Sequence, residues 1–288
     1  MTVRTRWLLA VVAALALLLA ACNGDTDVEE DDPADDDAEV EDDDDEVEDD
    51  DAADGDLGLA EDGVLQVGSD LDFEPFEFID EDGEPAGFDM DLIDEIAERL
   101  GVEVEVINVA FDTLITQLEA GEYDAVISAM TITDDRAERV DFSDPYFAAN
   151  QALVTQEGSD IAGVDDLAGA DVGVQAGTTG LDYASENFTE SEIVEFPGTP
   201  EAFTALESDQ VDAVFIDLPV ASEQAEGSDA LELVDEVDTA EEYGIAVQQG
   251  SDELLSAVND ALADILDDGT YEDIYSEWFE GDVPEQFR

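Results

Sequence analysis

Hydrophobic residues recur with two different periods along the chain from residue 57 to residue 279. Short runs of alternating or consecutive apolar residues predict strands, and runs with an apolar residue every three or four positions predict helices. The predicted strands cover 65–69, 102–109, 125–127, 172–174, 193–196 and 244–247, and the predicted helices cover 89–100, 112–120, 180–187, 200–207 and two stretches within 252–279. This alternation predicts an α/β fold with mixed, mostly parallel sheets flanked by helices.

One helix, turn and strand pattern occurs twice, about 90 residues apart. Residues 118–127 (LEAGEYDAVI) recur as residues 206–215 (LESDQVDAVF). The first strand runs into Ser128, and the second ends at Asp217. Because ligands of open α/β sheets bind outside the carboxyl ends of the strands, the two copies predict two lobes that face one cleft. The alternative is that the similarity reflects ordinary helix and strand composition.

Arginine is the only basic residue type, with six arginines against 84 acidic residues and no histidine. Arg136 follows a predicted strand and a hydroxyl-rich loop, residues 128–133. A guanidinium group offers a planar pair of N–H donors to a carboxylate, so Arg136 is a candidate for anion binding. The alternative is that Arg136 pairs with Asp134, Asp135 or Asp141 on the surface.

Acidic residues dominate the body of the chain. Residues 57–288 hold 62 acidic residues and four arginines, a net charge of −58. Such a charge opposes compaction in dilute buffer, whereas molar salt shortens the screening length to about 3 Å. We therefore expect a halophilic protein, adapted to high salt, for which nucleic acid is an implausible partner.

The N-terminus has the pattern of a lipoprotein leader. Two arginines precede a short apolar run, residues 7–18, and the sequence Leu-Ala-Ala-Cys at 19–22 resembles a bacterial lipobox. We therefore expect a signal peptide over 1–21 and a lipid on Cys22 that anchors the protein to the outer face of the cytoplasmic membrane. The alternative is that the apolar run is retained as a membrane anchor.

Residues 22–60 are predicted to form an acidic, disordered tether. Within 25–56, 22 of the 32 residues are Asp or Glu, and the apolar residues are only three valines and four alanines besides one proline, so this segment cannot bury enough surface to fold. A calcium-binding segment is the alternative, but the Gly-punctuated loop of an EF-hand is missing from it.

Cysteine and histidine counts restrict the chemistry. Cys22 is the only cysteine, and the chain has no histidine. This composition excludes disulfides within the chain, zinc sites of the Cys/His type, and Ser-His or Cys-His catalysis. We expect no metal, no cofactor and no enzymatic activity.

Several motifs, in order, resemble those of the family 3 extracytoplasmic solute-binding proteins of ABC amino-acid importers. They are Gly-Phe-Asp-Met-Asp at 87–91, Asp-Phe-Ser-Asp-Pro-Tyr at 141–146, Val-Gln-Ala-Gly-Thr-Thr at 174–179, and the ending Asp-Gly-Thr-Tyr-Glu-Asp-Ile-Tyr-Ser-Glu-Trp-Phe at 268–279. The resemblance runs from about Leu65 to Phe279. It implies a two-lobe fold of the type II periplasmic binding protein class.

In this class the chain crosses between the lobes twice. The resemblance places the first part of lobe 1 at 61–150, lobe 2 at 151–243 and the second part of lobe 1 at 244–288. Lobe 1 is therefore expected to be discontinuous and to contain the C-terminal helices.

The resemblance also implies how an α-amino acid is held. Arg136 would clamp the ligand carboxylate, helped by backbone N–H groups of Thr131 and Thr179. Asp217 would pair with the ligand ammonium group, assisted by oxygens of Ser128 and Thr131. Thr178 and Thr179 could also simply cap the following helix, which would itself leave N–H groups facing an anion.

A side-chain pocket follows from the same resemblance. Asp70, Phe73 and Phe111 would line it, although both phenylalanines could instead belong to the core. The wall would be completed by Ala129, Met130, Gln175 and Thr178. Two positions depart from the family pattern. Relatives often carry a long cationic or apolar residue where this chain has Gln175, and a residue with a hydroxyl group where it has Ala129.

Taken together, these features predict a monomeric binding protein that captures a free polar amino acid and delivers it to the permease subunits of an ABC transporter. Amide and cationic amino acids fit Asp70 better than acidic ones, and glutamine is the favoured substrate among glutamine, arginine, lysine and histidine. The alternatives are an enzyme of the same fold, such as a dehydratase, and a sensory amino-acid receptor.

Overall fold

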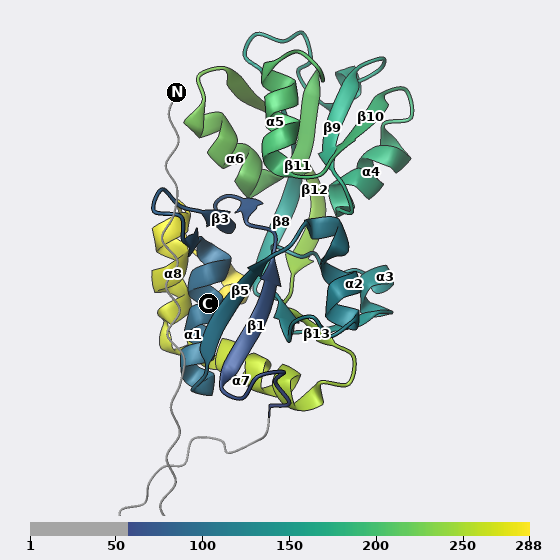
Figure 1. Cartoon of the computed structure of the whole chain (residues 1–288). Helices are drawn as coiled ribbons and strands as arrows, with labels where there is room; N and C mark the ends of the chain where they lie inside the picture. The colour runs from purple at the N-terminus through teal and green to yellow at the C-terminus, as the bar shows by residue number, and fades with distance from the viewer. Residues whose placement is uncertain (1–56) are drawn as a thin grey trace, which may run out of the picture. The chain divides into compact units, whose positions relative to one another are not determined.

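The computed structural model describes residues 57–288, so the predicted leader, lipid attachment at Cys22 and most of the tether lie outside the described residues. Two five-stranded mixed sheets form the frame (Figure 1). In spatial order the first sheet contains β5 (Glu103–Asn108), β1 (Val64–Ser69), β6 (Ala125–Val126), β13 (Ala246–Gln248) and β7 (Val140–Phe142). The second contains β10 (Glu192–Phe196), β9 (Asp171–Gln175), β11 (Ala213–Asp217), β8 (Phe147–Gln156) and β12 (Leu231–Tyr243).

Helices flank both sheets, and a small sheet lies beside the first of them. The helices are α1 (Phe88–Leu100), α2 (Leu114–Glu119), α3 (Asp134–Ala137), α4 (Thr179–Asn187), α5 (Thr199–Glu207), α6 (Leu218–Gly227), α7 (Asp252–Asp268) and α8 (Thr270–Trp278). Short 3₁₀ turns cover Phe111–Thr113, Val164–Asp166 and Glu285–Phe287, and the small sheet is built from β2 (Asp72–Phe73), β3 (Glu77–Ile79) and β4 (Pro85–Ala86). No helix within residues 57–288 combines the length and apolar character needed to cross a membrane.

Each predicted helix and strand is present, with ends that differ by a few residues. The mixed α/β fold is confirmed, but antiparallel pairing is more extensive than predicted. In the first sheet β1 is parallel to β5 and β6, whereas β13 is antiparallel to β6 and β7. In the second sheet β9 is parallel to β10 and β11, whereas β8 is antiparallel to β11 and β12.

The longest strand pair, β8 with β12, was not predicted. Its antiparallel register extends from Leu231 opposite Gln156 to Tyr243 opposite Phe147. In Figure 1 the two strands run side by side from the second sheet toward the first. Both predicted lobe boundaries, at 150–151 and 243–244, fall in or next to this pair, and the division into lobes stays a prediction.

The repeated sequence pattern is also a structural repeat. Helix α2 leads to β6 and helix α5 leads to β11, and each strand is parallel to an inner strand of its own sheet. The aspartate before each strand accepts a hydrogen bond from that inner strand: Asp124 from the Gln66 N–H at 2.9 Å and Asp212 from the Asp171 N–H at 2.8 Å. Because both copies make the same contact, the similarity exceeds shared composition.

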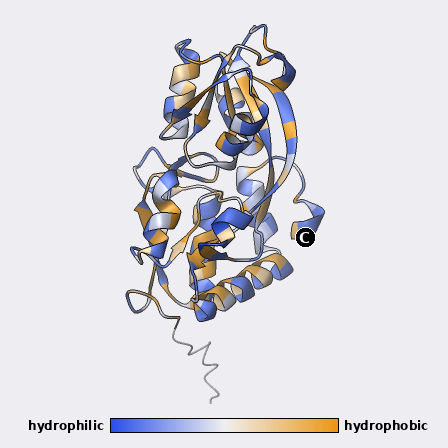
Figure 2. Cartoon of the chain, turned by 90° about the vertical axis from the view of Figure 1, so that its right-hand side faces the viewer, coloured by the Kyte–Doolittle hydropathy of each residue, from blue (hydrophilic) through white to orange (hydrophobic). Residues whose placement is uncertain are grey.

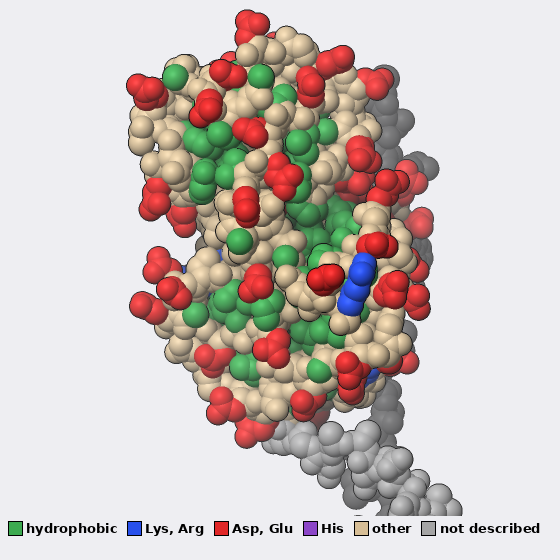
Figure 3. Space-filling view, turned by 180° about the vertical axis from the view of Figure 1, so that it is seen from behind, with side chains coloured by type: hydrophobic (Ala, Val, Ile, Leu, Met, Phe, Trp, Pro, Cys, Tyr) green, Lys and Arg blue, Asp and Glu red, His purple; other side chains and the backbone are tan. Residues whose placement is uncertain are grey.

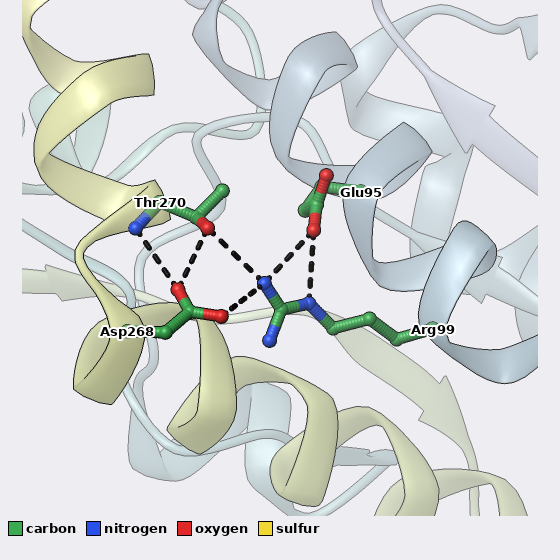
Figure 4. Close-up of polar contacts among 4 residues, drawn as sticks. All are labelled: Glu95, Arg99, Asp268 and Thr270. Atoms are coloured by element: carbon green, nitrogen blue, oxygen red, sulfur yellow. Dashed lines mark hydrogen bonds and ion pairs between the residues drawn. The ribbon is translucent and has the colours of Figure 1, made fainter.

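The C-terminal helices pack against α1. Hydrophobic positions gather in the strands and on the inward sides of the helices (Figure 2). At the edge of this contact, Arg99 of α1 donates to Asp268 at 2.8 Å and to Thr270 at 3.2 Å, and also bonds Glu95 (Figure 4). The neighbouring carboxylates raise the pKa of the Arg99 guanidinium against the opposing effect of burial. Arg99 therefore links α1 to the junction between α7 and α8.

Two buried carboxyl groups support the loop that follows β6. Asp89 Oδ2 accepts hydrogen bonds from the Ala129 N–H and the Tyr146 hydroxyl, both at 2.8 Å. Glu77 Oε1 accepts from the Ser128 hydroxyl at 3.0 Å. The other oxygens, Asp89 Oδ1 and Glu77 Oε2, have no further partner among the described residues.

The two carboxyl groups interact electrostatically, and because two like charges buried together repel each other, one of the two groups is favoured in its protonated form. Burial, with the adjacent Asp89 charge, raises the pKa of Glu77 well above its ordinary value, so Glu77 is the protonated partner. Burial also raises the pKa of Asp89, to about 6. The pair holds Ala129, whose φ of 43° is unusual for a residue other than glycine.

The unfolding free energy of Glu77→Gln, measured relative to that of the parent, is expected to be higher at pH 8 than at pH 4.5. A raised pKa means that the folded state binds the proton more tightly, so the contribution of Glu77 is complete below its ordinary value of 4.5 and is lost as the pH rises through the folded-state pKa. Glutamine is uncharged at every pH, so it does not repel the Asp89 carboxylate. The difference in unfolding free energy between Glu77→Gln and the parent should change by up to about 1.4 kcal/mol per pH unit in that window.

Urea unfolding in molar salt at several pH values measures this difference. Glu81→Gln, on an exposed residue of the turn that follows β3, is the control for the loss of one negative charge. A pH-independent difference for Glu77→Gln would show that Glu77 is ionised in the folded protein.

Candidate functional site

A narrow cavity of about 20 Å³ lies where strand ends of the two sheets meet. Its volume suffices for about one water molecule, so the side chains nearly fill it. The predicted site residues that line it are Asp70, Phe73, Phe111, Ala129, Thr131, Arg136, Gln175, Thr178, Thr179 and Asp217. Residues that line it without having been predicted are Glu77, Gln151, Gly180, Phe215 and Ile216.

Arg136 reaches the cavity from the short helix α3. One guanidinium nitrogen donates to the Thr131 carbonyl at 2.6 Å, and another donates to the Gly177 carbonyl at 3.1 Å. The guanidinium carbon lies 5.3 Å from the centre of the Phe111 ring, within the range of a cation–π contact. Phe111 therefore supports the arginine as well as lining the cavity.

Arg136 differs from the other arginines in its charge partners. Arg99, Arg139 and Arg288 each form an ion pair with a carboxylate, but Arg136 forms none among the described residues. The pairing with neighbouring surface aspartates is therefore not observed. Burial lowers the pKa of the Arg136 guanidinium, although the negative charge of Asp217 partly opposes this effect.

Asp217 ends strand β11 on the other side of the cavity and is 6% exposed. Its two oxygens accept short hydrogen bonds from the Gln151 amide and the Tyr243 hydroxyl. Burial raises the pKa of Asp217 to about 7, with a further contribution from the charge of Glu241. An added cation would favour the ionised form, which burial disfavours.

The N-terminus of helix α4 contributes backbone donors. The Thr178 hydroxyl accepts from the Leu181 N–H at 3.1 Å and so caps the helix. Thr178, Thr179 and Gly180 all line the cavity, which places the first turn of a nine-residue helix beside it. The free N–H groups and the dipole of a helix N-terminus favour an anion. Both predicted roles of these threonines, capping and site lining, therefore coexist.

The remaining end of the cavity is formed by Asp70 and Gln175. Gln175 Nε2 donates to Asp70 Oδ2 at 2.7 Å, and the Thr199 hydroxyl donates to Gln175 Oε1 at 3.3 Å. Burial raises the pKa of Asp70 to about 6, and the nearby charge of Asp72 adds to this shift. Phe73 lines this cavity and also belongs to the main hydrophobic core, 6.2 Å from the Phe76 ring.

Two predicted site residues do not line the cavity. The Ser128 hydroxyl accepts a hydrogen bond from the Asp70 N–H and donates its proton to Glu77, each at 3.0 Å, so that proton is not available to a ligand. Met130 is 1% exposed and packs in a hydrophobic cluster with Val109 and Leu114. Both side chains support the loop from behind the wall. Within residues 57–288, no group of three or more His, Cys, Asp or Glu residues is arranged to hold a metal ion.

Reasoning from the sequence did not identify Gln151 and Glu241 as site residues. Gln151 is fully buried in β8, and Glu241 is half-buried in β12. One weak signal was available, because a glutamine followed by the apolar run Ala-Leu-Val must find buried hydrogen-bond partners. Glu241 had no comparable signal among 84 acidic residues.

Comparisons with known proteins identify relatives of the whole described fold. The chain is 38% identical over 207 residues to the glutamine-binding protein GlnH of a Bacillus subtilis ABC transporter, covering 70% of this chain and 76% of the relative. An ancestral arginine-binding protein bound to glutamine is 43% identical, with a TM-score of 0.74 and coverage of 76% of this chain and 99% of that chain. The ancestral amino acid-binding protein AncCDT-1, a precursor of cyclohexadienyl dehydratase, is 39% identical, with a TM-score of 0.72 and coverage of 76% and 96%.

These similar structures have the two-lobe, type II periplasmic binding protein fold that the sequence motifs predicted. Residues 65–281 match the profile of one family. The chain belongs to the bacterial extracellular solute-binding proteins, family 3.

Proposed function

We propose that this protein binds a polar α-amino acid between its two sheets and delivers it to an ABC importer. One observation carries the proposal: a half-buried arginine on α3 that forms no ion pair among the described residues and a buried aspartate at the end of β11 line the same cavity. A zwitterion supplies the missing opposite charge to each of them. Bridging the two sheets also favours the form in which both contact the ligand.

The ligand carboxylate is assigned to Arg136 and the first turn of helix α4. Arg136 lines the cavity, and the Thr131 and Gly177 carbonyls and the Phe111 ring hold its guanidinium group there. Thr179 adds a backbone donor at the helix N-terminus. The ligand ammonium group is assigned to Asp217, whose raised pKa reflects burial without a paired cation.

The ligand side chain is assigned to the end formed by Asp70, Gln175, Phe73 and Phe111. Asp70 and the Gln175 amide present hydrogen-bond acceptors and donors but no basic group, which disfavours acidic side chains. Glutamine is our first choice, with arginine next. Support for both comes from the similar ancestral arginine-binding protein that was solved with glutamine bound.

A dehydratase is the second candidate, favoured by the similarity to the precursor of cyclohexadienyl dehydratase. Asp217, with a pKa of about 7, could exchange a proton near neutral pH. Mass spectrometry after incubation with each amino acid and with cyclohexadienyl acids distinguishes the candidates, because the binding function leaves every compound unchanged.

Removing either charged group of the clamp is expected to abolish tight binding. Arg136→Ala or Asp217→Asn leaves one end of the ligand desolvated and unpaired, a loss of roughly 3 to 5 kcal/mol, or several hundred-fold or more in affinity. Arg136→Lys should also bind poorly, because an ammonium group cannot reproduce the two-pronged contact. Asp70→Asn should instead change the ranking among the twenty amino acids. Calorimetry in molar salt measures these affinities.

Arg139→Ala is the matched control, because Arg139 lies three residues further on and pairs with Glu119 at the surface. Its affinity should equal that of the parent. Parent-like affinity in Arg136→Ala would remove the proposed site.

Cys22→Ser is expected to release the protein from membranes or to leave its leader uncleaved. The proposal that a lipidated Cys22 anchors the protein outside the cytoplasmic membrane is supported by the lipobox-like sequence at 19–22 and by membership of an extracellular family. Membrane fractionation and mass spectrometry of the mature N-terminus provide the measurement. Membrane association of Cys22→Ser with a mature N-terminus at residue 22 would contradict lipid anchoring.

Lowering the salt concentration is expected to destabilise the protein strongly. Acidic side chains spread over the face seen in Figure 3, where basic side chains are few. With 62 acidic residues and four arginines in 57–288, loss of screening between 1 M and 0.01 M salt should lower the melting temperature by roughly 10 °C or more. Calorimetric melting in sodium chloride measures the shift, and sucrose of equal osmolality controls for preferential exclusion. A constant melting temperature would refute adaptation to high salt.

A further inference from the structure

Glu241, on strand β12, lies directly behind three residues of the cavity wall. Its Oε2 accepts hydrogen bonds from the hydroxyls of Thr131 and Thr179, both at 2.7 Å. Its Oε1 accepts from Gln151 Nε2 at 3.1 Å. All three donors line the cavity, whereas Glu241 itself lines the groove on the other side of the strand. Thr131 follows the first sheet and Thr179 follows the second, so one carboxylate joins both sides of the cleft.

These bonds decide which way the two hydroxyl protons point. A carboxylate can only accept, so both threonine hydroxyls must donate to Glu241. The two hydroxyl oxygens lie 3.4 Å apart and each has a single proton, which Glu241 already uses. Toward the cavity, Thr131 and Thr179 therefore offer hydroxyl lone pairs and no hydroxyl proton.

Gln151 is oriented by the same carboxylate. Its amide nitrogen has two protons, one donated to Asp217 and the other to Glu241. Exchanging the positions of the amide oxygen and nitrogen would place the oxygen next to both carboxylates, which it would repel. The two acids therefore fix the orientation of the Gln151 amide. Gln151 Oε1 is buried and has no hydrogen-bond partner among residues 57–288. It lies beside the cavity-lining Gly180, where a Cβ atom would come within 3.0 Å of it.

We propose that Glu241 is a positioning residue that makes the Asp217 end of the cleft accept hydrogen bonds only, and so selects an ammonium group over a hydroxyl group on the ligand. This inference rests on the proposed amino-acid binding and names the group that the site distinguishes. Side-chain donors at this end are used internally, since Tyr243 donates to Asp217 and Gln151 donates to both acids. An ammonium group brings three donors to these acceptors, whereas a hydroxyl brings one.

An amide at position 241 would undo this selection. Glutamine has one acceptor oxygen in place of two, and its NH₂ group would donate to a threonine hydroxyl or face Gln151. At least one hydroxyl proton would then be free to turn into the cleft. A cleft with a donor there accommodates the oxygen of a 2-hydroxy acid, which the parent rejects.

The test compares a matched pair of ligands by calorimetry in molar salt. One is the L-amino acid that binds the parent most tightly in a screen of all twenty, and the other is the 2-hydroxy acid with the same side chain. The parent is expected to prefer the amino acid by about 100-fold or more, since each lost bond to a charged group weakens binding about tenfold or more. In Glu241→Gln the preference should fall at least about tenfold, mainly through tighter binding of the hydroxy acid.

Glu242→Gln is the matched control, because Glu242 is exposed on the same strand and its side chain makes no hydrogen bond among the described residues. Its preference should equal that of the parent. Glu241→Ala, which also frees the hydroxyls, serves if Glu241→Gln does not fold. A purely structural role would weaken both ligands equally and leave their ratio unchanged.

The measured affinities distinguish failure of amino-acid binding from failure of the role proposed for Glu241. If the parent binds none of the twenty amino acids, the proposed function fails and the inference fails with it. If the parent binds an amino acid but Glu241→Gln and Glu241→Ala keep the parent's preference, the inference alone is overturned.

Discussion

The half-buried positive charge of Arg136 is the constraint on which the rest of the site depends. A guanidinium group taken out of water needs an opposite charge or a full set of acceptors, and the described residues supply two carbonyl oxygens and an aromatic face but no ion pair. Residues 57–288 have a net charge of −58, so a shortage of acidic residues does not explain why Arg136 forms no ion pair among them. No acidic side chain of residues 57–288 forms an ion pair with this group, although Asp217, Glu241 and Asp182 are near enough to affect its pKa.

Two acids of the cavity, one after β1 of the first sheet and one at the end of β11 of the second, show the complementary arrangement. Burial raises the pKa of Asp70 to about 6 and that of Asp217 to about 7, so both acids lie in surroundings that disfavour their charge. Hydrogen bonds from Gln175, Gln151 and Tyr243 offset part of this effect. In the proposed function, a cationic group on the ligand would offset the rest.

The sequence was sufficient to predict the elements with strong periodicity and the site residues that belong to motifs. Helix α1 and the repeated unit that ends in β6 and β11 follow from local patterns, and Arg136 stands out by its rarity. Strand β12 was missed because acidic residues interrupt its apolar positions, and its pairing with β8 depends on residues about 90 positions away. Glu77 and Glu241 were missed for a different reason, since only the three-dimensional structure distinguishes a functional acid from the many surface acids.

Strands β8 and β12 have a consequence for the evolution of this protein. They are the longest strands of the described residues, and the groups that surround Asp217 come from them: Gln151, Glu241 and Tyr243. In the proposed function, the strands that run from one sheet toward the other would also position the groups that contact the ligand. A substitution there would then be expected to affect both the coupling between the sheets and the choice of ligand, so selection on one of these traits would also change the other.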